Sequence, residues 1–139
     1  MQNADLERNK QLMRTVTEEF LNKHDVSAVD RLYHPGYIQH NLQAPPGRDG
    51  VKTFFSMLFT AIPDLHATVD HLYAEGDKVF SFMTWNGTHR ADLMDLRASG
   101  QPIVIRTAEI FRIEDGRLAE HWDTVDMTDL VMKSNAARR

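Results

Sequence analysis

The sequence predicts an α+β domain in which N-terminal helices pack against one face of a curled antiparallel sheet. Apolar residues recur every three or four positions as far as Ile62, which is the spacing of helices with one buried face. From Leu65 onward, apolar and polar residues alternate, as in strands with one buried face. Two turn signals, Glu75-Gly76-Asp77 and Asp115-Gly116, divide this second part into hairpins. Helices followed by hairpins are the order typical of α+β folds.

Three helices are expected before the sheet. The first spans residues 4–23, where apolar side chains fall on one face. Asp25 is a suitable N-cap for a second, short helix over residues 26–33, which Pro35-Gly36 should stop. The third helix covers residues 51–62, with the strongest amphipathic pattern in the chain, and ends at Pro63-Asp64.

The strands are expected as two hairpins, formed by residues 65–74 with 78–89 and by residues 103–113 with 117–127. Residues 91–102, between the hairpins, could be an irregular strand, a short helix or a loop over an opening. A capped helix at 128–133 and a polar tail at 134–139, expected to be mobile, complete the chain.

Length and composition limit the classes of protein to which this chain can belong. A chain of 139 residues fits a single domain, with its core at about residues 5–127. The net charge of −4 gives no electrostatic reason to expect nucleic acid or an anionic membrane as a partner. Cysteine is absent, which excludes disulfides, thiolate nucleophiles and cysteine-bound zinc. Without an apolar leader or a membrane-length apolar run, a cytoplasmic location is the default expectation.

The alternation along the last two strands predicts which side chains can meet in a pocket beneath the curled sheet. Ala119, His121, Asp123 and Val125 share one face of the last strand. On the preceding strand, one face carries Thr107, Glu109, Phe111 and Ile113, and the other carries Val104, Arg106, Ala108, Ile110 and Arg112. Either face places an ionisable group among apolar neighbours, which is how a carboxylate or imidazole acquires a pKa suited to proton transfer.

Six short motifs occur in order between Val16 and Asp126. They are Tyr37-x-Gln39-His40-Asn41 ahead of a glycine-bearing loop, Pro63-Asp64, Gly76-Asp77, Gly87-Thr88-His89, Phe111-Arg112-Ile113 ahead of Asp115-Gly116, and Glu120-His121-Trp122-Asp123. In content and spacing they resemble the SnoaL-like polyketide cyclase family of the nuclear transport factor 2-like superfamily. The resemblance implies a cone-shaped α+β fold, with a curved antiparallel sheet wrapped by N-terminal helices around a central pocket, and a homodimer.

The resemblance also implies a chemistry. Characterised cyclases of the family close a ring by intramolecular aldol condensation without metal or cofactor, and their acid/base aspartate falls on Asp123 here. His121 could donate a hydrogen bond to the enolate or orient Asp123, so these two are the catalytic candidates. The candidates for contact with a small hydrophobic, carbonyl-bearing substrate are Gln39, His40, Asn41, Trp85, His89, Glu109 and Phe111.

Two positions depart from the family pattern. Leu42 follows the Gln-His-Asn triplet, where many members have proline, and Glu109 stands where ring-closing cyclases tend to carry an uncharged or imidazole side chain. Relatives in the wider superfamily include isomerases, dehydratases, cofactor-free oxygenases and many proteins of unknown activity. Cyclase-like or isomerase-like catalysis is therefore one hypothesis, and a non-catalytic ligand-binding or dimerising module of the same fold is the other.

Each candidate also has a structural interpretation. Asp123 and Glu109 could each pair with an arginine on a neighbouring strand, and His121 could be a structural histidine. His40 and Asn41 could cap the loop backbone, while Trp85 and Phe111 could pack in the core and His89 could simply end a strand. A metal held by His121, Asp123 and a third histidine (His40, His71 or His89) is not expected, because no recognisable metal-binding motif is present.

Overall fold

The computed structural model describes residues 2–138, and the predicted α+β class is confirmed. The helices of this part of the chain are α1 (Gln2–Val16), α2 (Val29–Leu32), α3 (Gly47–Ala61) and α4 (Thr128–Ala137). The strands are β1 (Tyr33–Gln39), β2 (His66–Glu75), β3 (Lys78–Thr88), β4 (Pro102–Glu114) and β5 (Arg117–Asp126). They form one sheet in the order β1-β5-β4-β3-β2.

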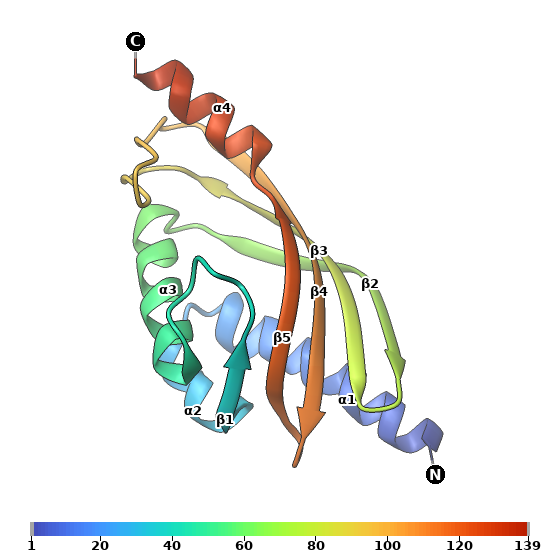
Figure 1. Ribbon diagram of the computed structural model, residues 1–139. Helices are drawn as coiled ribbons and strands as arrows, with labels where there is room; N and C mark the ends of the chain where they lie inside the picture. Colours follow the sequence, from blue (N-terminus) through green and yellow to red (C-terminus); the bar gives the residue numbers. More distant parts are fainter. Residues whose placement is uncertain (1, 139) are drawn as a thin grey trace.

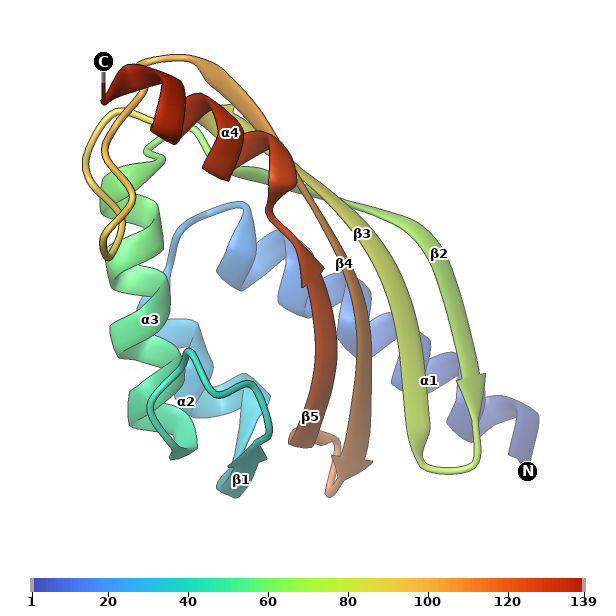
Figure 2. The same cartoon turned by 45° about the horizontal axis from the view of Figure 1, so that its top comes forward.

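The sheet bends around the N-terminal helices. In Figure 1 the long strands β2 to β5 curve past α1, and α3 stands opposite them. Figure 2 shows the same bend from a second direction, with α4 lying across the end of the sheet where β5 finishes. The buried core lies between the sheet and the helices, with Phe20, Ile62 and Met83 fully enclosed. Among the described helices, none has the length and apolar character needed to cross a membrane.

Strand β1 is the main difference from the predicted architecture. It pairs in parallel with β5, through Tyr33 with Leu118 and Gln39 with His121, so the sheet is mixed and not wholly antiparallel. The register shifts between Tyr33 and Ile38, around the Pro35-Gly36 pair that was expected only to stop a helix. Proline is tolerated here because β1 is an edge strand with one unpaired side.

The helices start and end close to the expected positions, with local differences. The first predicted helix is α1 followed by a π-helical turn at Thr17–Leu21. The Asp25 side chain accepts a hydrogen bond from the Ser27 backbone at 3.1 Å, as an N-cap does, ahead of a 3₁₀ turn at Val26–Ala28 and then α2. Helix α3 begins at Gly47, earlier than predicted. Helix α4 runs on to Ala137, through most of the predicted tail.

The two predicted hairpins are present. Strands β2 and β3 pair antiparallel up to Glu75 with Lys78, and β4 and β5 up to Glu114 with Arg117. Between β3 and β4 the chain forms a loop, with a bridge between Leu93 and Leu96 and a positive φ of 54° at Met94. The loop alternative for residues 91–102 is therefore the one that the structure adopts.

Candidate functional site

A cavity lies between the concave face of the sheet and helices α1 and α3. Its inner wall is apolar and aromatic, and its polar side chains come from β1, the loop after β1, β4 and β5. The cavity volume open to the centres of water molecules is about 90 Å³. The apolar part of the lining consists mainly of Met13, Val16, Leu21, Val51, Phe54, Phe55, Leu58, Trp85, Leu93, Ile105, Phe111, Val125 and Met127.

Asp123 reaches this cavity from β5, and its side chain is only 9% exposed. The side-chain amide of Asn41 donates to Oδ2 of Asp123 at 3.1 Å. Burial raises the pKa of the Asp123 carboxyl above its usual value, and the nearby Glu109 adds to the rise, while His121 and the Asn41 hydrogen bond oppose it. No arginine pairs with Asp123 among the described residues, so the ion pair considered from the sequence is absent there.

His121 and Glu109 form a buried pair beside Asp123. The distance from Nε2 of His121 to Oε1 of Glu109 is 2.9 Å, and the distance to Oδ2 of Asp123 is 3.9 Å. The Thr107 hydroxyl donates to Oε2 of Glu109 at 2.8 Å and accepts from the indole N–H of Trp85 at 3.0 Å. Glu109 thus has Thr107 and His121 as partners, in place of the arginine that was the alternative.

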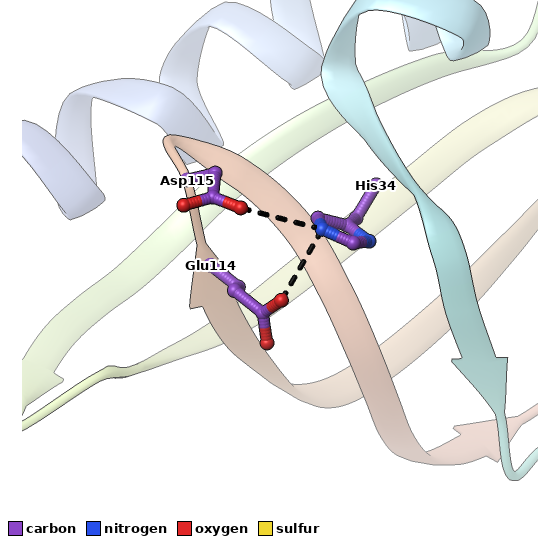
Figure 3. A group of neighbouring side chains, drawn as sticks. All are labelled: His34, Glu114 and Asp115. Carbon is purple, nitrogen blue, oxygen red and sulfur yellow. Dashed lines mark ion pairs between the residues drawn. The ribbon is translucent and has the colours of Figure 1, made fainter.

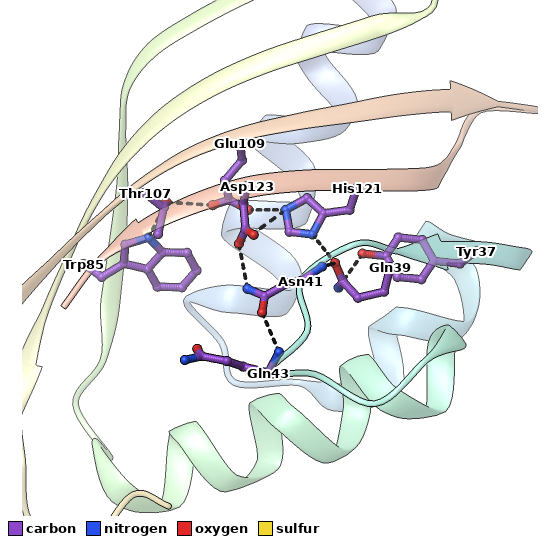
Figure 4. Close-up of polar contacts among 9 residues, drawn as sticks. All are labelled: Tyr37, Gln39, Asn41, Gln43, Trp85, Thr107, Glu109, His121 and Asp123. Atoms are coloured by element: carbon purple, nitrogen blue, oxygen red, sulfur yellow. Dashed lines mark hydrogen bonds and ion pairs between the residues drawn. The ribbon is translucent and has the colours of Figure 1, made fainter. Parts of the chain in front are cut away.

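Gln39 fixes the other side of the imidazole ring (Figure 4). Its Oε1 lies 2.8 Å from Nδ1 of His121 and accepts the backbone N–H of Asn41 at 3.1 Å. Its amide group donates to the Tyr37 hydroxyl at 2.9 Å. Because Oε1 can only accept, Nδ1 carries a proton and Nε2 is directed at the two carboxylates. The Phe111 ring stacks on His121 with centroids 4.2 Å apart, which holds the imidazole plane.

Seven of the nine predicted site residues therefore line one cavity: Gln39, Asn41, Trp85, Glu109, Phe111, His121 and Asp123. The structure does not place the other two in its wall. His40 points to the opposite face of the sheet, where its ring stacks on Trp122 and its Nε2 lies 2.8 Å from Glu120. His89 is fully buried at the end of β3, outside the cavity lining, and burial lowers its pKa.

Sequence reasoning missed Tyr37 and Tyr33 as cavity residues and did not single out Thr107 for the site. Burial raises the pKa of both tyrosines, so their hydroxyls stay protonated and can donate hydrogen bonds. A usable signal existed for Tyr37 and Thr107. Each lies two residues from a predicted site residue on its own strand, Gln39 and Glu109, and so faces the same way.

Two groups of side chains have metal-ligand chemistry. Ligand atoms of Glu109, His121 and Asp123 lie within 4.8 Å of one another, so this set could hold a cation if the Glu109–His121 hydrogen bond were given up. The second group is His34, Glu114 and Asp115 at the other end of the sheet (Figure 3). There Nδ1 of His34 accepts the Gly36 N–H, which puts the proton of the neutral ring on Nε2, facing the carboxylates at 3.2 and 3.5 Å. That arrangement favours hydrogen bonding of His34 to the two carboxylates over a metal site.

The fold and the site together define a small α+β protein with a carboxylate–imidazole cluster in an apolar internal cavity. The sequence model of the SnoaL-like polyketide cyclase family matches residues 11–132, and the chain belongs to this family. No curated protein matches the sequence.

Solved structures agree with that assignment. TsrD from Streptomyces laurentii is 31% identical, with 94% of this chain and 96% of TsrD covered and a TM-score of 0.84. IdmH from Streptomyces antibioticus, a proposed polyketide cyclase, is 25% identical, with 91% and 98% covered and a TM-score of 0.76. AclR from Streptomyces galilaeus, a proposed hydroxylase, is 24% identical, with 94% and 86% covered and a TM-score of 0.84, and so shares the fold.

Proposed function

We propose that this protein catalyses cofactor-independent acid/base chemistry on a hydrophobic, carbonyl-bearing small molecule, as an aldol-type ring closure or an isomerisation. The observation that carries the proposal is the state of Asp123, a buried carboxylate with a raised pKa on the wall of an apolar cavity. A carboxylate in such a place is a stronger base than one in water, and it can return the proton that it removes.

The first step is removal of a hydrogen from carbon beside the substrate carbonyl. Asn41 holds Oδ2 of Asp123, which leaves Oδ1 to take the proton. The electron pair of the broken C–H bond moves to the carbonyl oxygen as an enolate, and His121, whose Nε2 lies 3.9 Å from Oδ2 of Asp123, is the candidate hydrogen-bond donor to that oxygen. Attack of the enolate carbon on a second carbonyl closes a ring, and the alkoxide that forms takes the proton back from Asp123. Return of the proton to another carbon instead completes an isomerisation.

The test does not require the natural substrate, because both reactions begin with the same proton removal. Benzylacetone in D₂O exchanges its α-hydrogens, and NMR follows the rate with and without protein. Asp123→Asn should reduce the protein-catalysed rate about 10²-fold or more, as expected for loss of a general base. Asp77→Asn, at an exposed turn, is the matched control and should keep the wild-type rate. An unchanged rate in Asp123→Asn contradicts the assignment.

A non-catalytic binding module of the same fold is the second candidate. The small inner cavity, with Phe54, Phe55 and Trp85 in its wall, favours it, because much of the interior is filled by side chains. The same experiment separates the two functions. Wild-type protein that binds benzylacetone, shown by calorimetry, and yet does not accelerate exchange is a binder.

The homodimer is also a proposal, and it is supported by the convex face of the sheet. Tyr73, Phe80, Ile110 and Trp122 are neighbours across β2, β3, β4 and β5. Tyr73 is 62% exposed and Ile110 is 38% exposed, so a monomer presents this row to water. Ile110→Lys should shift a dimer to monomer in sedimentation equilibrium, and Met132→Lys, at a side chain 67% exposed on α4 and outside the sheet, is the control. A wild-type monomer at micromolar concentration contradicts the proposal.

A further inference from the structure

A second hollow adjoins the inner cavity, and Asp123 lies where the two meet. This outer groove is lined by residues from the loop after β1, the β3–β4 loop, the end of β5 and α4. Five residues line both spaces: Asn41, Gln43, Asp123, Val125 and Met127. The catalytic carboxylate is thus at the junction of two binding spaces and not at the bottom of one.

The inner space is too small for a large substrate. Its volume of about 90 Å³ is well below the roughly 300–1,000 Å³ of pockets that enclose a drug-sized ligand. Its walls are aromatic and aliphatic, with Trp85, Phe54 and Phe55 among them. It therefore suits a single apolar ring or a short apolar chain.

The outer groove is wider, with a volume of about 610 Å³, and two apolar side chains reach into it from opposite loops. Leu42 is 99% exposed and Met94 is 44% exposed, so neither is part of the core. Met94 also has a φ of 54°, a backbone conformation that methionine seldom adopts. Both side chains are placed to cover an apolar group that extends out of the inner cavity.

We propose that the substrate is an elongated, uncharged ketone with two apolar ends, one in the inner cavity and one in the outer groove, and with its reacting carbon between them at Asp123. The lining residues of the two spaces include no lysine or arginine but three carboxylates, Asp95, Glu109 and Asp123, which disfavour a substrate carboxylate or phosphate. The two lining histidines already have acidic partners, His40 in Glu120 and His121 in Glu109. A 1,3-diketone flanked by two apolar groups has this form. The position of the reacting carbon rests on the proposed function, whereas the two-part binding does not.

Two available diketones test the proposal, because they share the reacting carbon and differ by one ring. Benzoylacetone has one phenyl ring and dibenzoylmethane has two. Isothermal titration calorimetry gives Kd for each with the wild-type protein. The chain has two tryptophans, and Trp122 lines neither space, so Trp122→Phe leaves Trp85 as a fluorescence reporter of the inner cavity.

The outer groove is altered with the double substitution L42N/M94N. Both side chains are exposed, and asparagine adopts a positive φ more readily than methionine, so the fold should be retained. We expect dibenzoylmethane to bind the wild-type protein about fivefold to tenfold more tightly than benzoylacetone, and the double variant to lose that advantage while its Kd for benzoylacetone is unchanged. The control Met132→Asn, 67% exposed on α4 and outside both linings, should behave as wild type.

The outcomes separate this inference from the proposed function. Any one of three results would overturn the two-part site. The wild-type protein could bind the two diketones with equal affinity, it could bind neither, or L42N/M94N could weaken the binding of both equally. Two-part binding without any catalysed α-hydrogen exchange would leave the site in place and overturn the proposed acid/base function.

Discussion

Thr107 connects the wall of the cavity to the carboxylate–imidazole cluster, and replacing it with valine tests that connection. The Thr107 side chain is the acceptor for the indole N–H of Trp85 and the donor to Oε2 of Glu109. All three residues are buried, with 5%, 6% and 7% exposure for Trp85, Thr107 and Glu109. Valine has nearly the same shape as threonine, so Thr107→Val removes two hydrogen bonds with little change in packing.

The expected magnitude follows from the groups left behind. A buried polar group that loses its partner costs about 1–3 kcal/mol, and two such groups remain, namely the Trp85 N–H and the Glu109 oxygen. The additional apolar surface of valine returns less than about 1 kcal/mol. The net loss should be about 1–6 kcal/mol of the free energy of unfolding, with a middle value of about 3 kcal/mol, against the roughly 5–15 kcal/mol typical of a domain. A loss of about 3 kcal/mol lowers Tm by about 6–12 °C.

Urea denaturation and thermal melting measure this loss directly. Thr124→Val is the matched control, because Thr124 is exposed on the adjacent strand β5, and it should change the free energy of unfolding by less than about 0.5 kcal/mol. In a Trp122→Phe background, the emission of Trp85 should also shift, since its indole N–H loses its partner. A Thr107→Val variant as stable as the control would refute the view that the hydrogen-bond chain is a structural support of the site.

Two further predictions concern stability. Burial raises the pKa of Asp123 above 3.8 in the folded state. Stability should therefore fall as the pH rises from about 3.8 through the pKa of the folded protein, because the unfolded chain ionises Asp123 more easily. Asp123→Asn should thus gain stability over wild type in urea melts at pH 7 but not at pH 3, even though it loses activity; a loss at pH 7 would contradict the sign. Gly50→Ala should cost about 1–3 kcal/mol, because its Cβ would lie 1.7 Å from the Pro45 carbonyl oxygen. Gly36→Ala, whose nearest contact would be 3.4 Å, should cost much less, and equal costs in thermal melts would contradict the clash.

The sequence predicted most of the sheet because local patterns determine it. The alternation correctly grouped Thr107, Glu109 and Phe111 on one face of β4, and it grouped His121 and Asp123 on one face of β5. It could not say that both of these faces point inward, to the same cavity. The inward direction depends on which side of the sheet the helices cover, and the contacts between helices and sheet join residues that are distant in sequence.

Strand β1 could not be predicted in the same way. Its pairing partner lies about 80 residues away along the chain, as the Gln39–His121 pair shows, and its Pro35-Gly36 pair is typical of a helix end. This error explains the misplacement of His40. In an extended segment, Gln39 and Asn41 face one way and His40 the other, so the Gln-His-Asn triplet is divided between the cavity and the outer face.

The pKa of Asp123 is the most direct test of whether a buried base faces the cavity. Carboxyl ¹³C NMR of protein labelled at aspartate, with Asp123→Asn used to assign the resonance, gives the pKa in the folded protein. We expect a pKa above 3.8 for Asp123, and a pKa below 3.8 for Asp64, whose carboxylate accepts hydrogen bonds from the Thr88 backbone and hydroxyl. An Asp123 carboxyl that titrates with or below Asp64 would contradict the claim that a buried base faces the cavity.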